Sequence, residues 1–178
     1  MSKMTKTIAA LGVVAGLGVA AMPLSSYALE DTETVNLTVE VGQSIEITAK
    51  ETTVDLGEAT SSKMAEGGTV ITVHTNNEAG YNATIKADQP RLLSGDTDAI
   101  PSTGASAIPA NGTSAWGYKI GSITDYVAAS TTAQSFANTS AVSAQAGDTY
   151  DLNFAVSVAP NQAAGTYTGS VTLTATAN

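Results

Sequence analysis

An alternation of apolar and polar residues with a period of two runs through most of this chain and limits it to folds built from strands. The stretch VNLTVEV, residues 35–41, places Val35, Leu37, Val39 and Val41 on one face and polar side chains on the other. Because successive side chains of a strand point to opposite faces, this pattern is typical of a half-buried strand. The alternation recurs in seven further stretches: 44–50, 53–57, 69–76, 80–87, 115–120, 149–159 and 165–177.

The connections between these stretches predict their pairing. NNEAG, residues 76–80, has turn chemistry and predicts a hairpin between its two flanking strands. PNQAAG, residues 160–165, predicts that the last two strands are antiparallel neighbours, and Gly169 breaks the alternation as a bulge would. The final strand is therefore expected to stay within its own domain. Any polymer would then form through residues 29–36 or through side-to-side contacts.

These patterns predict an all-β fold. No stretch after residue 28 has a convincing apolar pattern at helical spacing, and the abundant Thr and Val favour strands. The chain has no cysteine, so its core alone must hold the fold together. About 150 residues suffice for one domain with a substantial core. We expect a single antiparallel β-sandwich of seven to nine strands, immunoglobulin-like in architecture and without the inter-sheet disulfide.

The first 28 residues have the features of a signal peptide. Lys3 and Lys6 form a basic start, an apolar stretch covers residues 8–22, and the small residues Ser26 and Ala28 suit signal peptidase. Cleavage after Ala28 would leave a mature domain of residues 29–178 that starts at Leu29. The apolar stretch is shorter than the roughly 20 residues that span a bilayer, so we expect a secreted or cell-surface protein without a stable membrane span.

The charge of the chain excludes some partners. The whole chain has 7 cationic and 16 acidic residues, a net charge of −9. The expected leader holds two of those cations and no acidic residue, so the mature domain has five against sixteen, a net charge of −11. A phosphate-binding surface needs clustered Lys and Arg. We therefore expect cell-envelope components or other surface proteins as partners, with self-association as a further option, and no nucleic acid.

Residues 94–147 are rich in Ser, Thr, Ala and Gly, and only AWGYKI, residues 115–120, stands out there as a strand. We expect a long, partly irregular region, and loops on a rigid scaffold are where recognition often lies. Two interpretations of its aromatic residues remain open. Trp116 and Tyr118 either complete the core or, with Tyr126, form an exposed platform on which sugar rings stack.

The inventory of catalytic and metal-binding residues is short. His74 is the single histidine, and the alternation turns it away from the face of Ile71 and Val73. No GxSxG motif occurs. Asp96 and Asp98 are weak candidates for a calcium site, but their spacing lacks the regular pattern of a recognised loop. We expect neither a catalytic activity nor a cofactor.

Several of these stretches together resemble a known group of proteins. The leader, LTVEVGQSIEITA, TVDLG, TVHTNNEAGYNATIKA, AWGY and NQAAGTYTGSVTLTATA resemble cysteine-free secreted β-sandwich surface proteins of bacteria, which are abundant in ultrasmall candidate-phylum lineages. The chain is also similar to the cell-wall-binding WxL domain in its Tyr167–Thr172 pattern, although Trp116 is followed by Gly117 and Tyr118 and the paired Trp-x-Leu motifs are absent. The resemblance implies a structural protein of the cell surface and transfers no catalytic residue.

Two functions follow as hypotheses. The first is a structural or adhesive surface protein, which the single strand-rich domain, the acidity and the lack of a catalytic motif favour. The second is a carbohydrate- or cell-wall-binding module that uses Trp116, Tyr118 and Tyr126. The direction in which these aromatic side chains point distinguishes the two hypotheses.

Overall fold

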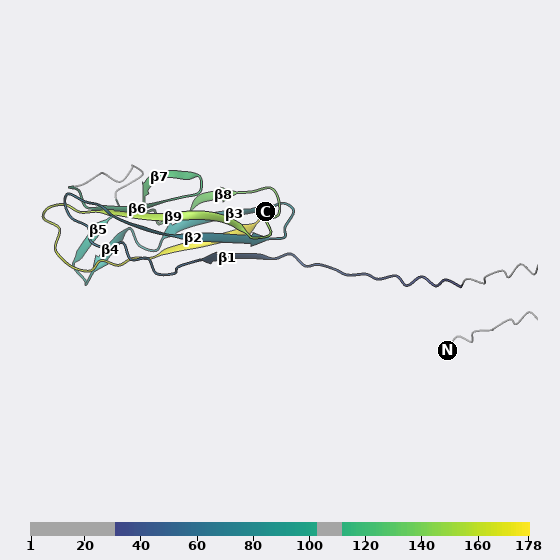
Figure 1. The fold of residues 1–178 in the computed structure, drawn as a ribbon. Coiled ribbons are helices and arrows are strands. Elements are labelled where there is room, and N and C mark those ends of the chain that lie inside the picture. Colours follow the sequence, from purple (N-terminus) through teal and green to yellow (C-terminus); the bar gives the residue numbers. More distant parts are fainter. Residues whose placement is uncertain (1–30, 103–111) are drawn as a thin grey trace, which may run out of the picture. The chain divides into compact units, whose positions relative to one another are not determined.

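Strands are the regular secondary structure of the described part of the chain (Figure 1). The computed structural model describes residues 31–102 and 112–178, and within these ranges it has ten strands and no helix. The strands are β1 (Ile45–Ala49), β2 (Ala65–Thr75), β3 (Tyr81–Ala87), β4 (Arg91–Ser94), β5 (Asp98–Pro101), β6 (Ala115–Ile120), β7 (Ile123–Ala128), β8 (Gln134–Asn138), β9 (Asp148–Ser157) and β10 (Val171–Ala177). The predicted all-β class is confirmed, with ten strands in place of seven to nine. The expected signal peptide, residues 1–28, lies outside the described residues.

Two antiparallel sheets form the layers of the sandwich. The larger sheet has five strands in the order β1-β2-β9-β6-β7, and the smaller sheet has three in the order β10-β3-β8. A separate hairpin is formed by β4 and β5. The β2–β9 pairing is the central one of the larger sheet and runs from Ala65 opposite Val156 to Val73 opposite Asp148.

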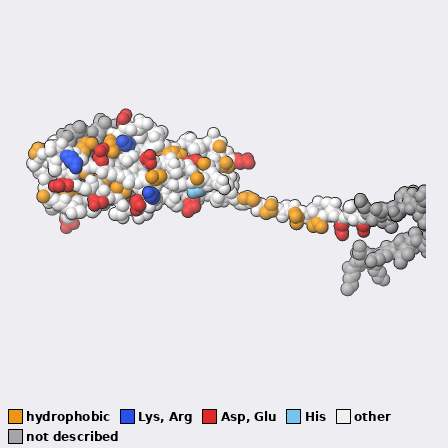
Figure 2. All heavy atoms as spheres, viewed as in Figure 1, with side chains coloured by type: hydrophobic (Ala, Val, Ile, Leu, Met, Phe, Trp, Pro, Cys, Tyr) orange, Lys and Arg blue, Asp and Glu red, His pale blue; other side chains and the backbone are white. Residues whose placement is uncertain are grey.

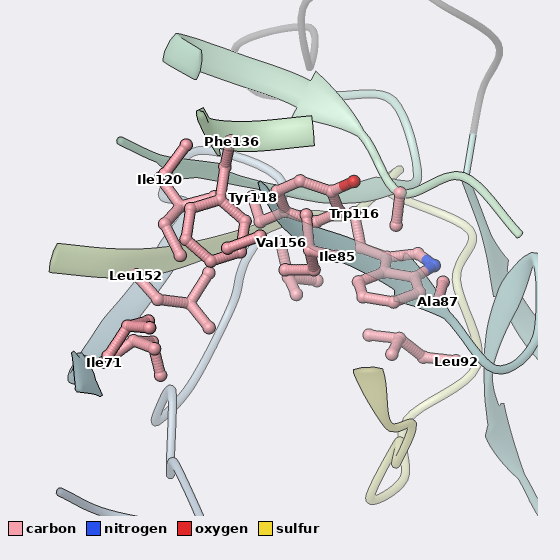
Figure 3. Packing of buried hydrophobic residues seen from close by; sticks show 14 of the residues in the cluster. Ile71, Ile85, Ala87, Leu92, Trp116, Tyr118, Ile120, Phe136, Leu152 and Val156 are labelled. Carbon is pink, nitrogen blue, oxygen red and sulfur yellow. The ribbon is translucent and has the colours of Figure 1, made fainter. Parts of the chain in front are cut away.

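The two sheets share one core. Alternate residues of β3, β6, β8 and β9 point inward, so that Ile85, Tyr118, Phe136 and Leu152 are all at most 1% exposed. Figure 3 shows these side chains packed against one another from strands of both sheets. Phe136 also contacts the ring of Tyr150 edge to face, with the ring centroids 5.4 Å apart. Because the chain has no cysteine, this packing takes the place that a disulfide has in many sandwiches.

A buried polar contact also joins the two sheets. The Tyr81 hydroxyl of β3 donates to Asp148 Oδ2 of β9 at 3.0 Å and lies 2.6 Å from the Tyr150 hydroxyl. Since Tyr81 gives its one proton to the carboxylate, Tyr150 must donate to Tyr81. Burial, followed by these two neighbours, raises the pKa of Tyr81. The phenol therefore stays neutral and serves as a permanent donor between the sheets.

The hairpin predicted at residues 76–80 is wrong. β2 belongs to the five-stranded sheet and β3 to the three-stranded sheet, so this connection crosses the sandwich. Asn77 makes the crossing possible, because its buried side chain donates to the Gly80 carbonyl at 3.0 Å and to the Asn178 carbonyl at 2.9 Å. Gly80 has a φ of +78°, and a Cβ there would collide with the Thr139 carbonyl.

The predicted partner of the final strand is also wrong. β10 pairs with β3 along its whole length, from Val171 opposite Ala87 to Ala177 opposite Tyr81, while β9 lies between β2 and β6. The strand does pair within its own chain, as expected. However, residues 158–170 form a long connection between the sheets instead of a tight turn, which lets the chain change layer. Gly169 lies within that connection, where a Cβ would come within 2.5 Å of Leu92.

The region 94–147 is more regular than predicted. It contains β5, β6, β7 and β8, although only β6 was predicted as a clear strand. The missed strands have four to six residues and few large apolar side chains. In β8, for example, Phe136 is the single large core residue. A pattern rule that counts alternating apolar residues does not detect such strands.

Two other predicted strands are not formed in the described residues. Residues 35–41 and 53–57 have the alternation of strands, but neither stretch has a strand partner there. Val54 and Leu56 of the second stretch are half-buried. In the first stretch, by contrast, Val35, Leu37 and Val39 are 78%, 93% and 86% exposed. The first stretch therefore has the composition of a strand without the environment of one.

Candidate functional site

The three aromatic residues predicted as a binding platform do not form one surface. Trp116 and Tyr118 lie on the inward face of β6 and are only 4% and 0% exposed, so they complete the core. Tyr126 of β7 is half-buried on the opposite face of the sheet, where the Lys119 ammonium lies 4.6 Å from its ring centroid. Burial and the neighbouring Glu66 carboxylate raise the pKa of Tyr126 to about 12. Neither Trp116 nor Tyr118 is available for stacking at the surface.

The predicted polar candidates are separate from one another. Asp96 and Asp98 are exposed in and beside the turn between β4 and β5. Within residues 31–102 and 112–178, no group of three or more His, Asp or Glu side chains is placed to hold a metal ion. His74 lies on the outer face of β2, opposite to the buried Ile71 and Val73, as predicted. It borders a shallow hollow of about 270 Å³.

A much larger groove of about 1150 Å³ lies between two loop segments of the domain. Its floor consists of side chains that belong to the core, namely Leu92, Ile100, Trp116 and Val156. Its two walls are residues 52–61, which follow β1, and residues 158–171, which lead into β10. We call this feature the apolar groove. No motif in the sequence marked it, because it is formed by segments distant in the chain.

Parts of both walls of the apolar groove have no ladder partner, although other parts are hydrogen-bonded, such as Thr60 to Lys63 and Ser170 to Asp88. Among the described residues, no backbone hydrogen bond joins residues 52–59 or 163–166 to a strand. The first ladder contacts of the second wall are the two 2.9 Å bonds between Thr168 and Leu93. Backbone N–H and C=O groups at a concave, apolar surface are the arrangement that accepts an extended polypeptide as an added strand.

Half-buried side chains line the inside of both walls. Val54 and Leu56 face the groove from the first wall, and Val158, Tyr167 and Val171 face it from the second. These residues would be fully buried only if another segment covered them. Trp116 at the floor carries an Nε1 donor that has no acceptor among the described residues. A buried donor without an acceptor is uncommon in folded proteins.

The surface around the groove is mainly acidic. Figure 2 shows Asp and Glu side chains spread over the visible face of the domain, with few Lys and Arg between them. Asp55 and Glu58 are exposed at the rim of the groove. The groove therefore combines an apolar floor with walls that also carry Thr, Ser and Gln side chains and with an acidic edge. Such an edge is unsuited to nucleic acid.

The fold and the groove together define a cysteine-free antiparallel β-sandwich with an open apolar groove. No protein-family model matches the chain, and a search of curated proteins finds no match. The described residues include no helix of sufficient length and apolarity to cross a membrane.

Proposed function

We propose that this protein is a secreted or cell-surface structural protein that acts through non-covalent contacts with other proteins and has no catalytic activity. The observation that carries the proposal is the apolar groove, whose walls include backbone at residues 52–59 and 163–166 with no ladder partner among the described residues, on either side of an aliphatic and aromatic floor. Such a surface suits an extended polypeptide, because main-chain hydrogen bonds supply affinity and alternate side chains enter the pocket.

Sequence features support the same function. Residues 1–28 have the pattern of an export signal, and the expected mature domain has a net charge of −11, which favours solubility outside the cell. The resemblance to bacterial β-sandwich surface proteins, including those with WxL domains, is consistent with such a location. A carbohydrate-binding function would need several exposed aromatic faces, and the burial of Trp116 and Tyr118 leaves only Tyr126 of the three residues predicted for it.

The proposal is tested by producing the full chain in a bacterium that exports it. We expect the protein in the extracellular or surface fraction, with an N-terminus at Leu29 on sequencing. A pull-down on purified cell wall, with light scattering after size exclusion, then identifies its partner. Protein contacts are expected to dominate, and wall fragments freed of protein should retain little of it. Retention in the cytoplasm, or tight binding to protein-free wall polysaccharide, would contradict the proposal.

A further inference from the structure

Residues 35–41 form a strand-like segment with its apolar side exposed. The four aliphatic residues Val35, Leu37, Val39 and Val41 are between 78% and 93% exposed, and the polar residues alternate with them. Figure 2 shows hydrophobic side chains gathered along this part of the chain. A seven-residue segment of high β propensity with a single charge, no Pro and no Gly is well suited to strand pairing. We call residues 35–41 the free strand segment.

Residues 42–44, which follow the free strand segment, are held by hydrogen bonds that oppose a reversal of the chain. The Asn76 side-chain amide donates to the Gly42 carbonyl at 2.8 Å, and its oxygen accepts from the Ser44 N–H at 2.7 Å. Gln43 also bonds to the Asn77 side chain at 3.3 Å. Gly42 lacks the positive φ that a three-residue hairpin loop normally requires. A hairpin between the free strand segment and β1 would have to break these contacts.

The domain's own groove is also far from this connection. Residues 42–44 bond to Asn76 and Asn77, at the end of the sandwich where Ala177 of β10 pairs with Tyr81. The apolar groove begins at the opposite end of β10, at Val171. Seven strand residues separate the two ends by about 20 Å. A segment anchored at residues 42–44 would use most of its length before it reached the groove of its own chain.

The sheet edge beside the groove, β10, is covered by a strand of the other sheet. β10, with the sequence VTLTATA, has seven residues and neither a charge nor a proline. The other edge strands differ, since β1 contains Glu46, β7 contains Asp125, and β8 is short with a register shift in its pairing. Natural proteins protect edges with charges, prolines, bulges or short strands. β10 lacks each of these features, but β1 of the larger sheet lies alongside it, so the groove and not the β10 edge is open to the free strand segment.

We propose that the free strand segment of one copy enters the apolar groove of a second copy. The valines and leucine of the segment then cover the half-buried wall residues, and its backbone pairs with the open walls. Residues 42–44, which directly follow the donor segment, bond at one end of the sandwich, and the acceptor groove opens at the other, so the contact joins copies head to tail and repeats into a linear fibre. This inference rests on the proposed function and specifies the partner as a second copy of the chain.

A matched pair of substitutions tests the donor side. Leu37→Asp places a charge on the apolar face of the free strand segment, and Thr38→Asp places the same charge on its polar face. Leu37 is 93% exposed and Thr38 is also exposed, so neither change should alter the fold or thermal stability of the monomer. We expect wild type and Thr38→Asp to assemble in light scattering and electron microscopy. Leu37→Asp should need at least about tenfold more protein to assemble, because it buries an unpaired charge.

Cysteine cross-linking tests the acceptor side, since the chain has no native cysteine. Separately purified Val39→Cys and Val171→Cys proteins are mixed and treated with a short bis-maleimide. A cross-linked heterodimer is expected. Gln134→Cys, on the exposed start of β8 in the same sheet, serves as the control acceptor and should give little product. In the Val39→Cys/Val171→Cys double variant, the proposal predicts cross-linked oligomers.

Three results would overturn the inference: a wild-type protein that stays monomeric, a Leu37→Asp variant that assembles like wild type, or a double variant that cross-links within single chains. The same preparations are fractionated from the producing cells. Export to the surface without assembly dependent on Leu37 would refute the inference and leave the proposed function intact. A protein found only inside the cell would instead refute the proposed function.

Discussion

Two Tyr→Phe substitutions in the same core should change stability in opposite directions. The Tyr81 hydroxyl joins the sheets through Asp148 Oδ2 at 3.0 Å and the Tyr150 hydroxyl at 2.6 Å, in a side chain that is 0% exposed. The Tyr118 hydroxyl, also in a fully buried side chain, has no partner among the described residues. Both changes remove one oxygen atom and leave the ring, so the difference between them isolates the hydrogen bonds.

The magnitude for Tyr81→Phe follows from the groups that lose a partner. A hydrogen bond to a charged group contributes about 1.5–3 kcal/mol, and the Tyr150 hydroxyl loses its acceptor as well. Asp148 keeps one bond, from the Ala144 N–H at 3.1 Å. We therefore expect the free energy of unfolding to fall by about 2–3 kcal/mol. For a domain of roughly 150 residues, this lowers the Tm by about 4–12 °C.

Tyr118→Phe removes a hydroxyl that is buried without compensation, so its expected effect is zero or a gain of up to about 1 kcal/mol. Both variants are measured by urea unfolding and by calorimetry, with the Tyr81→Phe/Tyr150→Phe double variant as a cycle. Coupling of at least about 0.5 kcal/mol between the two tyrosines is expected. The reasoning fails if Tyr81→Phe changes stability by less than about 0.5 kcal/mol, or if Tyr118→Phe is as destabilising as Tyr81→Phe.

Three further predictions concern the segments that connect the sheets. Gly80→Ala should lower the free energy of unfolding by about 1–3 kcal/mol, because the φ of +78° disfavours a side chain and the Cβ meets the Thr139 carbonyl. The control is Gly95→Ala, at an open turn where φ is +63°. Equal losses in the two variants would contradict the steric part of the argument. Hydrogen bonds from Ser170 and then Thr172, both at 2.6 Å, hold the pKa of Asp88 below its usual range. The ionised Asp88 carboxylate therefore stabilises the fold above about pH 4, and this stabilisation is lost as the pH falls through the lowered pKa. Asp88→Asn should therefore be less stable than wild type at neutral pH and lose less stability on acidification, and parallel pH profiles in urea would refute this. Deletion of residues 172–178 should unfold the domain, because β3 loses its ladder with β10, and a truncated protein that still gives a cooperative melting transition would count against it.

Alternation predicted the longer strands, missed the short ones β4, β5, β7 and β8, and did not predict how the strands are arranged. β1, β3 and β10 lie within predicted stretches, because a half-buried strand imposes its period on the local sequence. The same period does not say which sheet a strand joins. The connection at residues 76–80 has turn chemistry whether it forms a hairpin or crosses the sandwich, and the choice depends on whether Asn77 finds its partners in Gly80 and Asn178. These partners are set by the tertiary fold.

The candidate site was still harder to predict, because it is formed by loop segments that are distant in the chain. Two of the three aromatic residues predicted as a platform, Trp116 and Tyr118, belong to the core, since a large ring stabilises a small domain most when it is buried. Tyr167 and Leu56 line the groove, yet their local sequence resembles that of any half-buried strand. The one usable signal was the stretch 53–57, which alternates like a strand but is too short to hold a place in a sheet by itself.

The distribution of polar contacts explains how the domain tolerates an open groove. Near residue 80, Asn178 donates through its amide to the Thr139 carbonyl at 2.7 Å, Asn77 bonds to Asn178, and Tyr81 bonds to Asp148. These bonds close one end of the sandwich and fix the point at which residues 42–44 enter it. The opposite end, around Val171, has the apolar groove, in whose walls residues 52–59 and 163–166 have no ladder partner among the described residues. A domain whose core is closed by hydrogen bonds at one end can remain folded as a monomer while the groove at the other end stays able to bind a strand. Stability and assembly are then separable, so Leu37→Asp should abolish assembly without lowering the Tm, and Tyr81→Phe should lower the Tm without abolishing assembly.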